Sequence, residues 1–139
     1  MANNLATLVD SCVILDVVTG DDQWADWSAE RMAQVLDEGR VVINPLICAE
    51  VSVGYQSAEE LDEFLPASDY EREALPYRAG FAAGKAFLRY RRSGGTRRSP
   101  LPDFCIGAHA ALAGYRLLTR DASRYRSYFP KLELIVPAG

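Results

Sequence analysis

The stretch Leu5-Ala6-Thr7-Leu8-Val9-Asp10 decides the fold, because it is a short apolar run that stops at a carboxylate. A continuous apolar run of this length is typical of a strand that is buried on both faces of a parallel sheet. Four further strands are expected, at residues 41–43, 64–66, 116–119 and 132–136.

Helical patterns separate these strands. Trp24, Met32 and Val35 recur at helical spacing ahead of Gly39, which is a natural helix stop. The other helices are expected at residues 45–54, from the capping box Ser57-Ala58-Glu59-Glu60 onward, at 77–92 and at 102–113. The alternation of helices with short apolar strands predicts a single α/β domain over residues 1–139, with a parallel sheet and helices on both faces.

The expected helix at residues 77–92 has apolar residues on more than one side. One stripe consists of Ala79, Ala83, Ala86 and Tyr90, and another consists of Phe81, Gly84 and Leu88. Packing within the domain is the simplest explanation of both stripes. The alternative is that the domain core covers one side and a partner covers the other.

Charged residues are divided unevenly along the chain. Among 139 residues, 15 are Lys or Arg and 19 are Asp or Glu, so the formal net charge is −4. Residues 1–76 contain sixteen acidic and three basic residues, whereas residues 77–139 contain three acidic and twelve basic ones. The total gives no hint of a polyanionic partner, but the basic second half is compatible with one.

The composition excludes several classes of protein. With 49% hydrophobic and 24% charged residues, the chain is neither disordered nor fibrous. No apolar run approaches the roughly 20 residues of a membrane span and no targeting segment is evident, so a cytoplasmic protein is expected. The three cysteines lack the spacing of a disulfide scaffold, and we expect reduced thiols. Because His109 is the single histidine, chemistry that needs two imidazoles is excluded.

Four acidic residues are expected at one edge of the sheet. Asp10 and Asp121 directly follow strands, and Asp103 opens the helix that precedes the strand at 116–119. Glu50 lies about a turn and a half into the helix that follows the second strand. Ligands of parallel sheets bind at the carboxyl ends of the strands, where these four residues meet. Each acid alone is explained as a capping or solvated group, but their combination indicates a site.

A cluster of carboxylates favours a bound cation. Two carboxylates 4 Å apart repel by about 4 kcal/mol at an effective dielectric constant of 20. Oxygen ligands suit Mg²⁺ or Mn²⁺, which also bind phosphate oxygens. The matching reaction is hydrolysis of a phosphodiester by a metal-activated water. Cys105 and His109 share a helix face, but a zinc site needs further ligands and is the less favoured alternative.

Four segments, taken in order, resemble the motifs of one known family. They are Val9-Asp10-Ser11-Cys12-Val13, Ala49-Glu50-Val51, Pro102-Asp103-Phe104-Cys105-Ile106-Gly107-Ala108-His109-Ala110 and Leu118-Thr119-Arg120-Asp121. Their order, their spacing and the chain length are similar to those of PIN-domain ribonucleases. The resemblance is greatest to the VapC-like toxins of type II toxin–antitoxin systems. Each motif is weak alone, but four motifs in order are specific.

This resemblance implies a five-stranded parallel sheet in the order 3-2-1-4-5 and an endoribonuclease that depends on Mg²⁺ or Mn²⁺. The implied substrate is structured RNA, often transfer RNA. Asp10, Glu50, Asp103 and Asp121 take the places of the family's metal-binding and catalytic acids, and Thr119 takes that of its hydroxyl residue. The resemblance also implies a homodimer, a cognate VapB-like antitoxin and a larger toxin–antitoxin assembly.

One position departs from the family's pattern. Cys12 stands where the family usually has Asn, which puts the rate of turnover in doubt more than the binding of the metal. Asp16 is expected to be an ordinary solvated acid, although it stands where the family often has an outer acidic residue.

Arginines surround the loop that contains Gly94 and Gly95, shortly before Asp103. The candidates for contact with RNA phosphates are Arg89, Arg92, Arg97 and Arg98, and Tyr90 is available to stack on a base. An RNA strand that follows these arginines would arrive at the acidic site. A solvated basic face is the alternative.

Two other classes of protein stay open at this point. A PIN-like module that is catalytically weak or inactive, and that binds RNA or protein, would keep the fold, and Cys12 is the feature that supports it. A receiver-like domain that is phosphorylated on one Asp would also gather acids at a sheet edge. That domain requires neither four acids nor the basic loop.

Overall fold

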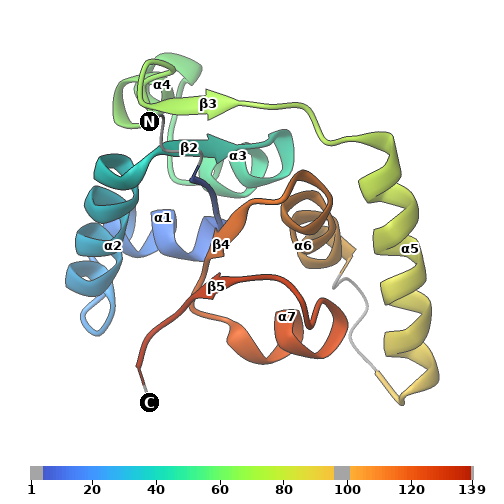
Figure 1. The fold of residues 1–139 in the computed structure, drawn as a ribbon. Coiled ribbons are helices and arrows are strands. Elements are labelled where there is room, and N and C mark those ends of the chain that lie inside the picture. Colours follow the sequence, from blue (N-terminus) through green and yellow to red (C-terminus); the bar gives the residue numbers. More distant parts are fainter. Residues whose placement is uncertain (1–4, 96–100, 139) are drawn as a thin grey trace.

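The computed structural model describes residues 5–95 and 101–138 (Figure 1). The strands in these ranges are β1 (Ala6–Val9), β2 (Arg40–Ile43), β3 (Tyr70–Arg72), β4 (Arg116–Leu118) and β5 (Leu134–Ile135). The helices are α1 (Ser11–Thr19), α2 (Ala25–Glu38), α3 (Pro45–Ser52), α4 (Ala58–Phe64), α5 (Tyr77–Arg92), α6 (Leu101–Ala113) and α7 (Ala122–Tyr128).

The strands form one parallel sheet in the order β3-β2-β1-β4-β5, which confirms the predicted fold. The first strand, β1, lies at the centre between β2 and β4, and all four of its residues are buried. This explains why the segment that ends at Asp10 is so uniformly apolar. Receiver domains have the order 2-1-3-4-5, so the receiver-like alternative is wrong.

The third strand is not where the sequence predicts it. Phe64 ends α4, Leu65 is the buried residue after that helix, and the strand follows at Tyr70–Arg72. The capping box at Ser57 is present as predicted and starts α4, which then continues through Phe64. Because β3 is an edge strand with one neighbour, its outer residues are polar and give no apolar signal.

Two helices were not predicted from the sequence. Helix α1 begins directly after Asp10, whose side chain accepts a hydrogen bond from the backbone N–H of Ser11. It ends at Gly20, which has the left-handed conformation that glycine adopts at low cost. Its run of apolar and β-branched residues lacks a clear helical period. Helix α7 is short, and Asp121 precedes it without a capping hydrogen bond from its side chain.

Helices cover both sides of the sheet, as predicted (Figure 1). Helices α1 and α2 lie on the left of the strands in Figure 1, and α5 and α6 lie on the right. Helix α5 packs on α6 through the predicted stripe of small residues, because Ala79, Ala83 and Ala86 meet Phe104 and Ala108. This contact fixes the helix that carries Asp103.

The other apolar side of α5 is exposed in the isolated chain. Tyr77 is 99% exposed, Phe81 is 71% exposed and Leu88 is 40% exposed. Packing within the domain therefore covers the stripe of small residues, but the expectation that it also covers the stripe with Phe81 and Leu88 is wrong. No helix within the described ranges is both long and apolar enough to cross a membrane.

Candidate active site

The carboxylate of Asp10 is fixed at the carboxyl end of the central strand, and the Asp10 residue is only 4% exposed. Its Oδ1 accepts a hydrogen bond of 2.8 Å from the backbone N–H of Ser11. Its Oδ2 accepts hydrogen bonds from two hydroxyls, that of Thr119 at 2.8 Å and that of Tyr125 at 3.1 Å. Three donors from three segments therefore determine the orientation of this carboxylate.

Thr119, which takes the place of the family's hydroxyl residue, orients the carboxylate of Asp10 in the structure. Its fully buried hydroxyl donates to Asp10 and accepts a 3.1 Å hydrogen bond from the backbone N–H of Asp121. One hydroxyl thus connects two of the predicted site acids.

Glu50 is joined to the site through Ser11. The Ser11 hydroxyl donates a 2.7 Å hydrogen bond to Oε1 of Glu50, while the Ser11 backbone N–H binds Asp10. Neither Ser11 nor Tyr125 was proposed as a site residue from the sequence. The spacing of Tyr125, Tyr128 and Phe129 after Asp121 is helical and was the available signal for α7.

Electrostatic repulsion shows that the four predicted acids are close together. Burial raises the pKa of Asp10 to about 6, and repulsion from Asp103 adds to the effect of burial. Burial also raises the pKa of Asp103, and repulsion from Glu50 and from Asp121 acts in the same direction. Asp103 therefore interacts with each of the other three acids, which the structure brings together at one edge.

A cation of the chain itself already lies in this cluster. Arg124, from the first turn of α7, donates from Nη1 to Oδ2 of Asp103. The side chain of Arg124 is 12% exposed and that of Asp103 is 31% exposed. This pair lowers the pKa of Asp103 and partly offsets the two effects that raise it.

The oxygen donors of the site fit a hard divalent cation. In the described ranges, no three His, Cys, Asp or Glu side chains surround one point as a ready-formed metal cage. Burial is the main cause of the raised pKa values of Asp10 and Asp103, and repulsion between the acids adds to it, so a nearby cation would favour the ionised carboxylates. Carboxylate oxygens are the ligands that Mg²⁺ and Mn²⁺ prefer.

Cys12 lies beside the site, where it packs against the groups that hold Asp10. Its Sγ is 3.7 Å from Oδ2 of Asp10 and 3.7 Å from Oγ1 of Thr119. Burial, followed by repulsion from Asp10, raises the pKa of the thiol to about 12. Cys12 is therefore a neutral thiol and not a nucleophile at neutral pH.

A buried ion pair holds the loop between β4 and α7. Asp16 accepts hydrogen bonds from Nε of Arg120 at 2.6 Å and from Nη2 at 2.9 Å, and a third from Ser28 at 2.7 Å. The Arg120 guanidinium also lies over the ring of Trp24. Because Arg120 stands between Thr119 and Asp121 in the sequence, its ion pair with Asp16 helps to hold both of these residues in place. Asp16 is buried, so it is not an ordinary solvated acid.

The predicted RNA-binding arginines are only partly described. Arg89 and Arg92 are exposed on the last turns of α5. Arg89 donates a 3.3 Å hydrogen bond to the backbone carbonyl of Tyr128, and its guanidinium lies over that ring. This contact places Arg89 next to α7. Arg97 and Arg98 lie outside the described residues.

The single histidine belongs to a structural network. His109 is fully buried; its Nδ1 is 3.0 Å from the side-chain amide of Asn44 and its Nε2 is 2.7 Å from Glu73. Since both ring nitrogens have protein partners, His109 is not available to form a zinc site with Cys105. The three cysteines are free, as expected.

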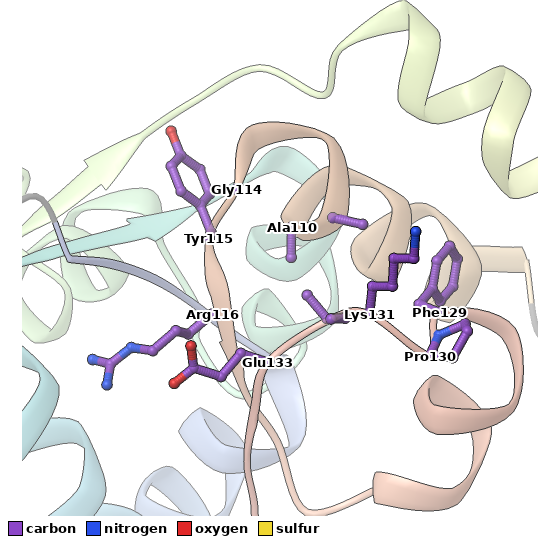
Figure 2. Close-up of a pocket in the computed structure, with 10 residues that line it drawn as sticks. Ala110, Gly114, Tyr115, Arg116, Phe129, Pro130, Lys131 and Glu133 are labelled. Atoms are coloured by element: carbon purple, nitrogen blue, oxygen red, sulfur yellow. The ribbon is translucent and has the colours of Figure 1, made fainter.

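One hollow of the structure lies away from the four site acids. It has a volume of about 410 Å³ and is formed at the starts of β4 and β5 and the end of α6 (Figure 2). Its walls include Tyr115, Phe129 and Leu132. Asp10 and Asp121 follow the opposite ends of the strands, so this hollow is not part of the acidic site.

A five-stranded parallel sheet with acids gathered at its carboxyl edge defines an α/β domain with a carboxylate site. Comparison with family models narrows this class, because the PIN domain model matches residues 7–129. The chain belongs to the PIN domain family. The comparison with curated protein sequences gives no significant match.

Several solved structures share the fold. VapBC2 from Rickettsia felis, bound to a fragment of promoter DNA, has a TM-score of 0.73 at 15% identity, over 96% of this chain and 100% of that one. VapBC-1 from nontypeable Haemophilus influenzae has a TM-score of 0.70 at 18% identity, over 95% of this chain and 98% of that one. FitAcB from Neisseria gonorrhoeae has a TM-score of 0.66 at 13% identity, over 93% of this chain and 96% of that one. At these identities, the similarity shows the fold alone.

Proposed function

We propose that the protein is a metal-dependent endoribonuclease toxin that hydrolyses phosphodiester bonds of structured RNA. The observation that carries the proposal is the meeting of Asp10, Glu50, Asp103 and Asp121 at the carboxyl edge of a PIN fold. Mg²⁺ or Mn²⁺ supplies a water of lowered pKa and neutralises charge on the phosphate.

The chain's own residues hold the donors for that ion. Asp103 interacts electrostatically with the other three acids, so it is the common ligand in this proposal. Thr119 and Tyr125 fix one oxygen of Asp10, and Ser11 ties Asp10 to Glu50. These hydrogen bonds keep the carboxylates oriented without help from the metal, and such preorganisation lowers the cost of binding it.

Cleavage of RNA tests the proposal. Total RNA is incubated with the wild type, with Asp10→Asn and with Asp103→Asn, in Mg²⁺ or Mn²⁺ and in EDTA. Asp22→Asn, in an exposed loop, is the matched control with the same loss of charge. We expect cleavage by the wild type and by the control, and none in EDTA or by the two site variants.

Cleavage that persists in EDTA and in both variants would show that the metal mechanism is wrong. Wild type that binds RNA without cleaving it favours the second candidate, a catalytically inactive PIN-like binding module. The feature of the structure that favours this second candidate is Cys12, whose thiol occupies the space beside Asp10 and Thr119.

We further propose that a VapB-like antitoxin inhibits the protein, which acts in the cytoplasm as a homodimer within a larger toxin–antitoxin assembly. Complexes named VapBC and FitAcB share its fold, which supports the antitoxin proposal. The exposed apolar side of α5 supports the homodimer, since isolated domains seldom leave such a face uncovered. Co-expression with the product of the adjacent gene, followed by co-purification and loss of RNA cleavage, tests the antitoxin proposal.

A further inference from the structure

Arg124 has an unusual environment for a guanidinium. It is largely shielded from solvent and is paired with Asp103, the acid that interacts with all the others. The guanidinium and a divalent cation compete for Asp103, because the two positive charges repel each other. A metal that takes Oδ2 of Asp103 displaces Arg124 from that oxygen.

The surroundings of Arg124 provide a place for the released group. A polar hollow of about 280 Å³ adjoins the acids and is lined by Tyr90, Asp121, Ser123, Arg124, Ser127 and Tyr128. Four of these side chains carry hydroxyls, and Arg124 is the cation among them. Arg89 packs against Tyr128 at the border of this hollow. Hydroxyls and a guanidinium are the donors that bind phosphate in proteins.

We propose that Arg124 changes partners during the reaction. In the metal-free protein it neutralises Asp103, and when a divalent cation binds Asp103, the guanidinium turns to the hollow beside Asp121 and binds a phosphate of the RNA strand. This inference rests on the proposed function. Arg124 already lines the hollow, so a change of side-chain conformation is sufficient.

This change of partner has two measurable consequences, which should occur together. Arg124 weakens metal binding in the absence of RNA, and it strengthens RNA binding once a cation is present. Such coupling is reciprocal, so metal and RNA each increase the affinity for the other.

The first measurement is calorimetric titration of the metal-free protein with Mn²⁺. Arg124→Gln should bind Mn²⁺ about tenfold more tightly than the wild type, because the competing cation is gone. Arg126→Gln removes the same charge from an exposed position on the same helix and should change the affinity less than about twofold. Arg124→Met, which keeps the length of the side chain, replaces Arg124→Gln if that variant does not fold, and the same tightening is expected.

The second measurement is the binding of a fluorescent RNA hairpin in EDTA and in Ca²⁺, which takes the same oxygen ligands as Mg²⁺. Gel analysis verifies that the RNA stays intact. The wild type and Arg126→Gln should bind RNA more tightly in Ca²⁺ than in EDTA, and Arg124→Gln should lose most of this gain.

Failure of the inference is distinguishable from failure of the proposed function. A wild type that binds no Mn²⁺ and cleaves no RNA overturns the proposed function, and the inference falls with it. A wild type that does both, with an Arg124→Gln variant that keeps the wild-type Mn²⁺ affinity or the full gain in Ca²⁺, overturns the inference alone.

Discussion

At the scale of single residues, one oxygen of Asp10 has partners from three separate segments of the chain. Its Oδ2 accepts from the hydroxyls of Thr119 and Tyr125, and it also contacts the thiol of Cys12. These donors stabilise the ionised form against burial. The sequence identified Asp10 and Thr119 through their motifs, but it did not identify Tyr125. Tyr125 and Asp10 are in contact in space but lie 115 positions apart in the sequence.

The Tyr125 hydroxyl is expected to keep Asp10 ionised. Tyr125→Phe removes a hydrogen bond that lowers the pKa of Asp10, so the pKa should rise above its present value of about 6. Metal-dependent cleavage should then fall about tenfold near pH 6 and much less at pH 8. A pH–rate profile measures this shift, and Tyr77→Phe, which removes an exposed hydroxyl from α5, is the control. An equal loss at both pH values would contradict the prediction.

Ionised Asp10 destabilises the metal-free protein. Its pKa rises from 3.8 to about 6 on folding, so the folded chain binds more protons than the unfolded chain between about pH 4 and pH 6. Stability therefore falls as the pH rises through this window, by about 3 kcal/mol from this group. Urea unfolding in EDTA should show Asp10→Asn to be more stable than the wild type at pH 7.5, but not at pH 4.

The matched control for this experiment is Asp22→Asn, in an exposed loop. It should follow the wild type at both pH values. A variant Asp10→Asn that is less stable than the wild type at pH 7.5 would show that the hydrogen bonds of the carboxylate outweigh its desolvation.

At the scale of helices and strands, the sequence predicted most of the elements whose signal is local. The stripe Ala79, Ala83 and Ala86 predicted α5 with its observed ends, and the capping box at Ser57 predicted the start of α4. It misplaced β3, because an edge strand with polar outer residues has no apolar run. It missed α7, because seven residues are too few for a clear helical period. The part of the site that α7 contributes, including Arg124, was missed with it.

The packing of α6 on α7 depends on a glycine. A Cβ at Gly107 would lie 2.6 Å from the ring of Phe129 and 3.0 Å from that of Tyr125, whereas a Cβ at Gly84 would have no neighbour within 4 Å. Gly107→Ala should therefore destabilise the chain by about 1–3 kcal/mol and displace the hydroxyl that holds Asp10. Gly84→Ala should stabilise it by up to about 1 kcal/mol through helix propensity.

Thermal unfolding and RNA cleavage measure both variants. Equal stabilities for Gly107→Ala and Gly84→Ala would mean that α7 moves away from α6 without cost. In that case the cleavage rate of Gly107→Ala should still fall, because Tyr125 moves with the helix.

At the scale of the whole molecule, the acidic and basic halves are partly joined to each other. Arg116 pairs with Glu38 and Arg120 pairs with Asp16, so arginines of the second half neutralise acids of the first. Part of the uneven charge pattern is therefore explained by ion pairs within the fold, and not by contact with a nucleic acid. Sequence alone did not separate these two uses, because pairing between distant residues depends on the topology.

Arg97 and Arg98, which lie outside the described residues, are expected to bind RNA phosphates. Replacing Arg97 and Arg98 by Ala should weaken RNA binding and reduce the slope of log K against log salt concentration by about 1 to 2, since each lost phosphate contact contributes roughly 0.7 to 0.9. Arg40→Ala, on a first-half arginine paired with Glu71, is the control. Binding measured from low to high salt gives the slope, and an unchanged slope would exclude both arginines from the RNA contact.

The exposed apolar side of α5 is expected to hold a second copy of the chain. Phe81→Ser and Leu88→Ser remove apolar surface from this side without touching the buried stripe. Light scattering should show a dimeric wild type and monomeric variants at micromolar concentration. Dimers that persist in both variants would place the contact elsewhere.

The central position of β1 also governs when the site forms during protein synthesis. In the order of synthesis, Asp10 precedes its hydroxyl partners Thr119 and Tyr125 by 109 and 115 positions. At bacterial or eukaryotic rates of elongation, this delay is on the order of ten seconds. Strand β4, which lies beside β1, arrives equally late. The hydrogen bonds that orient Asp10 therefore form only after α7 has been synthesised, so the carboxylate site is incomplete in a shorter nascent chain.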